Sequence, residues 1–136
     1  MVQPIMRDPL FLAVESEEAT RDDLQVAQDL RDTLICHLDH CVGMAANMIG
    51  VRKRIIAVDD GHSILIMFNP EIERAQDEYE TQEGCLSLDG LRPCRRFRKI
   101  QVRYQTERMQ TKRRTFKDYT AQIIQHEIDH TNGVLI

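Results

Sequence analysis

Residues 125–136 read QHEIDHTNGVLI and contain two histidines, His126 and His130, in the pattern H-E-x-x-H. Residues four apart lie on one face of an α-helix. The two imidazole rings can therefore bind one metal ion, and Glu127 between them can take a proton from a water molecule. The motif alone leaves open an amphipathic helix with two incidental histidines. Because two histidines are too few ligands for a metal site, a third ligand must come from elsewhere in the chain.

The residues before this motif predict the helix that carries it. The helix is expected to begin near Thr115 or Asp118. Five side chains recur at spacings of three and four and form one stripe: Phe116, Tyr119, Ile123, His126 and His130. Because most of this stripe is apolar, it should face the protein interior and direct both histidines inward.

The best candidate for the third ligand is Cys85, in the stretch TQEGCLSLDG (81–90). The extended pattern H-E-x-x-H-x-x-G-x-x-H requires a histidine where this chain has Ile136, and no acidic residue follows Asp129. Gly84 allows a close approach of the backbone. A thiolate and two imidazoles leave one coordination position open for water. The alternative for Cys85 is a small buried apolar residue.

The remaining cysteines, Cys36, Cys41 and Cys94, give a weaker signal. The absence of a signal sequence favours free thiols over disulfides. In CHLDHC (36–41), each cysteine lies four residues from a histidine, but the two pairs occupy different faces of a helix. A single metal site with four ligands is therefore not expected there.

Length and composition suit one globular domain that spans residues 1–136, since 42% of the residues are hydrophobic and 29% are charged. The longest apolar run, residues 64–68, is far shorter than the about 18 residues of a membrane-spanning helix. The beginning, MVQPIMRDPLFLAVE, carries Arg7 and Asp8 and no apolar signal core. We therefore expect a cytoplasmic protein with no membrane partner.

A helix is predicted in the first third of the chain, within residues 19–43. Thr20 can cap it with Asp23 as the capping-box partner, and Gly43 is a plausible end. Its apolar side chains fall close to one face, which indicates that it packs on a core.

Strands are predicted between the two helices. Residues 54–58 and 63–69 are apolar runs separated by a turn sequence, and Pro70 should end the second run. Residues 99–106 alternate with period two and can pair with residues 113–116. The expected fold is α+β, with small mixed or antiparallel sheets packed around a central C-terminal metal-binding helix and an N-terminal helix beside them.

The segment from Arg92 to Lys117 contains eleven basic residues and one acid, Glu107, although the whole chain has a net charge of −4. One interpretation is the solvated face of an exposed hairpin. The other is a surface that meets RNA or another polyanion, for example on the ribosome.

Three motifs resemble those of the peptide deformylase family, and the resemblance covers nearly the whole chain. QHEIDH (125–130) and EGCLS (83–87) are full matches. CVGMAANM (41–48) corresponds to the usual G-x-G-L-A-A-x-Q but diverges from it. Cys41 replaces a glycine, Met44 replaces leucine and Met48 replaces glutamine.

The resemblance implies a role for each matched residue. Cys85, His126 and His130 would bind one divalent ion, with ferrous iron expected and zinc or nickel as substitutes. Glu127 would be the general base and later the acid, and Leu86 would offer its backbone N–H to the formyl oxygen. Substrate-binding residues would be Gly43, Gly84, Arg92 and Ile123. The implied reaction is hydrolysis of the formyl group from the N-terminal methionine of a nascent polypeptide.

Met48 is the departure with chemical consequences. The glutamine that the family has at this position donates a hydrogen bond to the developing oxyanion, whereas a thioether has no donor. Losing one such donor costs about 10²–10³ in rate. Asn47 is not expected to replace it, because adjacent side chains of an extended segment point to opposite faces. The chain is therefore either a slower deformylase or an impaired paralogue that keeps the metal site and binds peptide N-termini.

Overall fold

The structure is a computed structural model that describes residues 1–136. Five antiparallel strands form one sheet in the order β1-β2-β3-β4-β5. The elements follow the chain as α1 (Pro9–Leu12), the 3₁₀ turn η1 (Arg21–Asp23), α2 (Leu24–Cys36), β1 (Gly43–Ala45), η2 (Ala46–Ile49), β2 (Ile55–Asp59), β3 (Ile64–Cys85), β4 (Leu88–Gln105), β5 (Thr111–Lys117) and α3 (Asp118–Thr131). The α+β prediction is confirmed, and a single curved sheet replaces the several small sheets that were expected.

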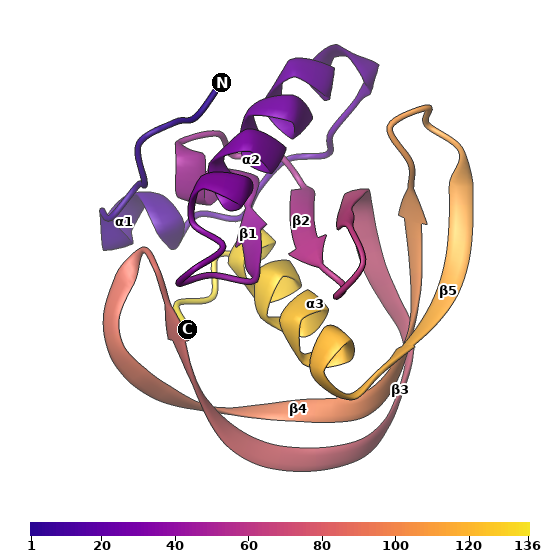
Figure 1. Ribbon diagram of the computed structural model, residues 1–136. Helices are drawn as coiled ribbons and strands as arrows, with labels where there is room; N and C mark the ends of the chain where they lie inside the picture. Colours follow the sequence, from indigo (N-terminus) through magenta and orange to yellow (C-terminus); the bar gives the residue numbers. More distant parts are fainter.

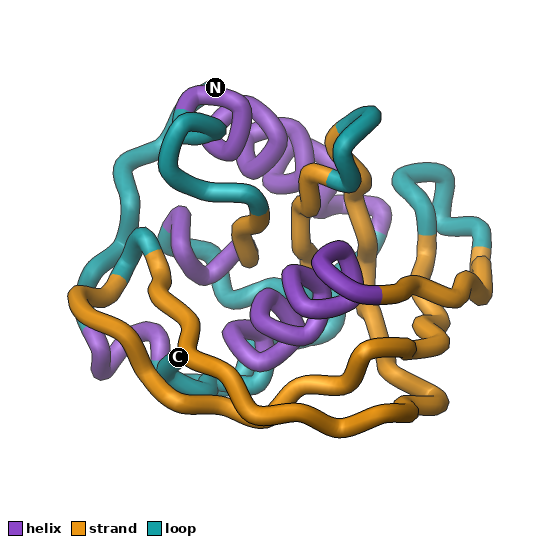
Figure 2. The backbone as a smooth tube through the Cα atoms, turned by 60° about the horizontal axis from the view of Figure 1, so that its bottom comes forward, coloured by secondary structure: helices purple, strands orange, loops and turns teal.

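The long β3–β4 hairpin curves beneath α3, as Figure 1 shows. Seen from that side in Figure 2, α3 lies across the hairpin, with α2 on the opposite side of the molecule. None of the helices has the length and apolar character required to cross a membrane.

The N-terminal helix was predicted with the right start and the wrong end. Thr20 and Asp23 form the expected capping box, and the chain then enters α2 through η1. The helix ends at Cys36, whereas Gly43 opens β1 instead of ending the helix. The cause is the loss of apolar side chains at the helix's buried face: the next apolar residue after the helix, Leu38, remains 38% exposed.

Pro70 does not end its strand, contrary to the sequence prediction. β3 continues to Cys85 because the register shifts between Phe68 and Glu71 and again between Ile72 and Arg74. A bulge removes the need for a backbone N–H at the proline, so the strand can continue past it. β4 likewise starts at Leu88, well before the predicted residue 99. The predicted pairing of residues 99–106 with 113–116 is confirmed in the register of β4 and β5.

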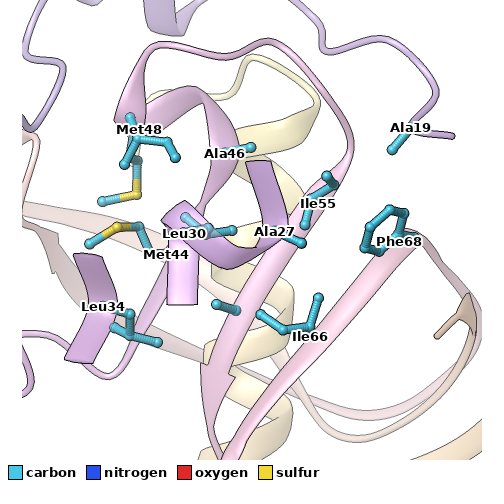
Figure 3. Close-up of a cluster of buried hydrophobic side chains, with 12 residues drawn as sticks. Ala19, Ala27, Leu30, Leu34, Met44, Ala46, Met48, Ile55, Ile66 and Phe68 are labelled. Carbon is cyan, nitrogen blue, oxygen red and sulfur yellow. The ribbon is translucent and has the colours of Figure 1, made fainter. Parts of the chain in front are cut away.

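Two apolar clusters hold the layers together. The first packs α2 and η2 against β1, β2 and the start of β3, and Figure 3 shows Met44 and Met48 side by side within it. The second packs α3 against the sheet through residues such as Ile100, Phe116 and Ile124. Because α3 contacts β4 and β5 as well as β1, β2 and η2, its buried face is fixed by several elements.

Three residues of the predicted inward stripe lie on the buried face of α3, whereas Phe116 and Tyr119 do not. Ile123, His126 and His130 are buried, whereas Tyr119 is 62% exposed. Phe116 is buried as a strand residue of β5, paired with Ile100, and does not belong to the helix. The helical spacing therefore cannot be extended from Phe116 to Tyr119.

Candidate metal centre

The structure brings Cys85, His126 and His130 together. The thiol lies at the end of β3, both histidines lie on α3, and their ligand atoms are all within 4.8 Å of one another. The Nε2 atoms of the two imidazoles face each other at 3.0 Å. Three soft or borderline donors that converge on one point fit a divalent transition-metal ion.

A buried polar network supports His126 from behind. Its Nδ1 atom lies 2.8 Å from Glu83 Oε1, which leaves Nε2 free to face the cluster. Arg96 donates to Glu83 at 2.7 Å and to Asp129 at 2.7 Å, and Gln122 donates to the other Glu83 oxygen at 2.9 Å. Such a carboxylate partner fixes the tautomer and orientation of a ligating histidine. Burial alone would raise the pKa of Glu83, but its hydrogen bonds with His126, Arg96 and Gln122 bring it well below the ordinary value.

The two histidines differ in their affinity for protons. Burial lowers the pKa of His126, but hydrogen bonds with Cys85 and Glu83 outweigh this and raise it to about 10. Burial, together with the positive charge of His126, lowers the pKa of His130 to about 3. The low pKa of His130 favours the neutral imidazole, which is the form that binds a metal ion.

Glu127 is buried beside the cluster, and its Oε1 atom has no hydrogen-bond partner. Burial raises the pKa of this carboxyl to about 7, although the charge of His126 opposes the shift. A carboxyl group with a pKa near neutrality can both accept and release a proton under physiological conditions. Glu127 is thus suited to acid–base chemistry beside the group formed by Cys85, His126 and His130.

A cleft of about 930 Å³ opens over the cluster, between α3, β1 and the turn that joins β3 to β4. All but two of the site residues predicted from the sequence line it: Met48, Gly43, Gly84, Cys85, Leu86, Ile123, His126 and Glu127. His130 is fully buried behind the lining. Arg92 is not part of the lining, and its guanidinium group donates to the backbone oxygen of Asp89 at 3.3 Å.

Gly43 lies where β1 passes close to α3. A Cβ atom at this position would come within 2.6 Å of Ile123 Cγ2 and 2.9 Å of Glu127 Oε2. Contacts this short cannot be accommodated without moving the side chains of Ile123 and Glu127 or the backbone. Gly84 is less constrained, because the nearest atom to its Cβ would be Leu91 Cδ2 at 3.3 Å.

The segment with Met48 and Asn47 is a 3₁₀ turn, not the extended chain that the sequence prediction assumed. Met48 is 1% exposed and its sulfur accepts a long contact from Ala45 N at 3.5 Å. Asn47 does not line the cleft, and its amide donates to His130 O at 2.8 Å. The Asn47 amide therefore contacts α3 and does not provide a side-chain hydrogen-bond donor in the cleft beside Met48.

Sequence reasoning missed the supporting residues Glu83, Arg96, Asn47 and Asp129. Glu83 could have been found, because it lies two positions before Cys85 and residues two apart in a strand share a face. Arg96 could not, because its place beside Glu83 depends on the register of a hairpin whose strands were not predicted that far. Cys36, Cys41 and their neighbouring histidines do not belong to the group of possible ligands that Cys85, His126 and His130 form. All four cysteines are free thiols.

A cysteine and two histidines at one point, with a buried carboxyl group alongside and a cleft above, are typical of metal-dependent hydrolases. The comparisons with known proteins agree with this class. The family described as polypeptide deformylase matches residues 3–136. The chain is 50% identical to a peptide deformylase of Clostridium beijerinckii over 136 residues, which is the whole of both chains. It is 37% identical to that of Thermoanaerobacter pseudethanolicus, over 82% of this chain and 70% of the relative.

Solved structures give the same answer. Peptide deformylase from Thermotoga maritima superimposes with a TM-score of 0.89 at 28% identity, covering 99% of this chain and 95% of the other. The actinonin-bound class I type b enzyme from Acinetobacter baumannii gives 0.87 at 28% identity, with the same coverage. The chain belongs to the peptide deformylase family. It is a metal-dependent hydrolase that removes the N-formyl group from nascent polypeptides.

Proposed function

We propose that Cys85, His126 and His130 hold one divalent ion in this deformylase domain, residues 1–136, with ferrous iron as the expected metal and zinc or nickel as substitutes. The observation that carries the proposal is the convergence of the three donor atoms within 4.8 Å at the base of the cleft. When bound, such an ion supplies Lewis acidity and makes water a stronger acid. The soft thiolate favours a transition metal over magnesium or calcium.

Glu127 would carry the proton transfers of the reaction. Its carboxylate takes a proton from the attacking water and later delivers it to the nitrogen of the leaving methionine, while formate is released. The pKa of about 7 supports both steps, since the group changes its protonation state near physiological pH. Glu83 would keep His126 oriented throughout, through the contact at Nδ1.

Leu86 would meet the negative charge that develops on the formyl oxygen, through its backbone N–H. The peptide would lie against the free edge of β1, which is an outer strand of the sheet, between Gly43 and Gly84. Ile123 would contact the methionine side chain from the helix side. Arg92 is proposed only as a contact for a peptide that extends past the residues lining the cleft.

Turnover of formyl-Met-Ala-Ser by the iron-loaded protein tests this proposal, with acetyl-Met-Ala-Ser as the matched control. The expected result is release of formate from the first peptide and no reaction with the second. An iron-loaded protein that releases no formate would contradict it.

A second candidate function rests on Met48. Its thioether lines the cleft where the family has a donor, so a paralogue that binds peptide N-termini without turnover is the alternative. Equilibrium binding of formyl-Met-Ala-Ser without formate release supports this alternative. Catalytic release of formate at a rate proportional to the enzyme concentration would exclude this alternative.

We also propose that the enzyme works in the cytoplasm and meets ribosomal RNA through part of the basic segment 92–117. Several of its arginines are neutralised by acids: Arg95, Arg96, Arg103 and Arg113. Lys99, Arg114 and Lys117 are exposed, make no ion pair and border one shallow hollow. Lys99 and Lys117 also lie directly opposite each other in the sheet, a repulsion that a bound phosphate would relieve.

Filter binding to ribosomal RNA, repeated at about 50 mM and about 200 mM salt, measures this contact, since phosphate contacts weaken steeply with salt. Neutralising Lys99, Arg114 and Lys117 to glutamine should weaken binding and reduce its salt dependence. The same change at Arg95, Arg103 and Arg113 is the matched control and should have a smaller effect. No binding at the lower salt concentration would remove the proposal.

A further inference from the structure

The N-terminal segment before α1 is fixed along the cleft by contacts on both sides of Arg7. Met6 N donates to Met48 O at 2.7 Å, so the segment is tied to the first-motif turn. Asp8 caps α1 by accepting from Leu10 N. Ile5 packs against the first apolar cluster. Arg7 therefore leaves the backbone from a defined position, and its side chain is among those that line the cleft.

The Arg7 guanidinium reaches across to the turn between β3 and β4. Its Nη1 atom donates to Leu86 O at 3.1 Å, joining residues that are 79 positions apart in the chain. This is the only hydrogen bond that reaches the turn residues 86–87 from outside the hairpin. The hydroxyl group of Ser87, the other residue of the turn, is buried without a partner. The register of the hairpin also shifts beside the turn, between Gly84 and Cys85.

The position of this turn has a direct chemical consequence. Leu86 carries the backbone donor proposed for the formyl oxygen, and an oxyanion donor acts only when it is fixed at hydrogen-bond distance before the reaction. A displacement of about 1 Å can cost about 10²-fold in rate. Met48 offers no second donor on the other side of the cleft, so the reaction depends more strongly on the placement of Leu86.

We propose that Arg7 is a positioning residue for deformylation, which holds the Leu86 turn so that its backbone N–H stays directed at the substrate oxygen. This inference rests on the proposed role of Leu86. Only one of the guanidinium's five N–H donors is used by Leu86.

Steady-state kinetics with formyl-Met-Ala-Ser test the effect on catalysis. Arg7→Met keeps much of the side-chain volume and removes the donors, so kcat should fall about tenfold, with KM changed less than twofold and the melting temperature unchanged. Arg7→Lys keeps a donor and the charge and should retain most of the activity. Arg21→Met is the matched control, because Arg21 is an exposed arginine of η1, away from the cleft. An equal fall in the control, or an unchanged kcat in Arg7→Met, would overturn the proposal.

Amide hydrogen exchange tests the same contact without any turnover. In Arg7→Met, exchange at Leu88, which pairs with Cys85 across the turn, should become about tenfold faster, while the amides of α3 remain as in the parent. Unchanged exchange at the turn would contradict the proposal that Arg7 holds it, even if the enzyme is active. Faster exchange throughout the chain assigns Arg7 a structural role and also contradicts it. If the parent releases no formate, the proposed function fails, and the exchange result still decides whether Arg7 holds the turn.

The kinetic coupling between Arg7 and Met48 completes the test. In a protein that carries Met48→Gln, the glutamine amide would donate a second hydrogen bond to the oxyanion. The loss of kcat caused by Arg7→Met should then shrink to about threefold or less. A loss of the same size in both backgrounds would contradict the link between the two positions.

Discussion

The two walls of the cleft differ in how many hydrogen bonds support the side chains that form them. The helix wall, formed by Cys85, His126 and Glu127, is supported by a buried network in which Glu83 receives hydrogen bonds from three side chains. The methionine wall, formed by Gly43 and Met48, offers only apolar surface and backbone. The first wall would need fixed ligand positions to hold an ion, whereas the second would only need to fit the substrate.

This difference separates metal binding from charge stabilisation in the same cleft. All the groups that would hold the ion and move the proton are in place. Met48 has no donor for the oxyanion, which would leave that task to the proposed backbone donor of Leu86. We therefore expect substitutions in the helix wall to abolish function and substitutions in the methionine wall to adjust its rate.

Glu127→Gln should have the largest effect on the helix wall. The amide cannot accept the proton of the attacking water, so formate release should fall by about 10³ or more. The metal content should stay at that of the parent, since the three donor residues are untouched. Formate release and metal analysis of the same sample measure both. A variant that keeps more than a tenth of the parent rate would show that another group is the base.

Met48→Gln should have the largest effect on the methionine wall, and in the opposite direction. It introduces a donor at the cleft wall, so kcat should rise by up to about 10². Met48→Leu is the matched control, because it conserves volume and adds no donor. A gain of equal size in both variants would mean that packing, and not hydrogen bonding, limits the rate.

Glu83→Gln tests the network behind the helix wall. The change leaves the buried Arg96 with only part of its negative partner and weakens the contact with His126. Metal affinity should fall about 10–100-fold, and the protein should lose about 3–5 kcal/mol of stability. Competition with a chelator and denaturant unfolding measure the two effects. Glu80→Gln, whose side chain is 82% exposed beside Arg95, should change neither.

The two glycines of the cleft should respond differently to alanine. Gly43→Ala forces a Cβ atom against Ile123 and Glu127, so it should cost about 1–3 kcal/mol of stability and lower the rate of formate release. In Gly84→Ala the Cβ atom would lie 3.3 Å from the flexible end of Leu91 and at the ordinary contact distance of 3.5 Å from Gly90 O, so the variant should lose less than about 1 kcal/mol of stability. Thermal unfolding and formate release measure both variants. Equal losses would mean that the close approach of β1 to α3 is not what requires Gly43.

The smallest effect concerns the chemical reactivity of the thiols outside the metal cluster. Burial raises the pKa of Cys41 to about 12 and that of Cys94 to about 11, so both remain protonated at pH 8. The thiolate is the reactive form, and Cys36 is exposed. Iodoacetamide at pH 8 should therefore label Cys36 first, as followed by mass spectrometry. Labelling of Cys41 at the same rate would contradict its burial beside the cleft.

Local patterns in the sequence were enough to predict the metal helix, because the three- and four-residue spacing of Ile123, His126 and His130 depends on helix geometry alone. The third ligand came from the resemblance and from the absence of later ligands. What the sequence could not show are the contacts between distant segments. Asn47 and His130 are 83 residues apart, and Arg7 and Leu86 are 79 residues apart. Such contacts depend on how the layers pack, which no local periodicity records.

The errors at element ends have the same physical origin. The bulges after Phe68 allow the strand to pass Pro70, and the exposed position of Tyr119 follows from a helix that starts two residues after Phe116. Both errors arise because strand pairing overrides the secondary-structure preference of the individual residues, Pro70 and Phe116. The sequence did not show which residues of the basic segment are neutralised. Acids that pair with its arginines lie on β3, as Glu78 does for Arg95.

X-ray absorption spectroscopy of the zinc-loaded protein tests most directly whether a mid-chain thiol and two helix imidazoles share one ion. We predict one sulfur neighbour at about 2.3 Å and two imidazole nitrogens at about 2.0–2.1 Å, with the sulfur signal lost in Cys85→Ala. A spectrum of the parent with no sulfur neighbour, or one that keeps its sulfur in Cys85→Ala, would contradict it.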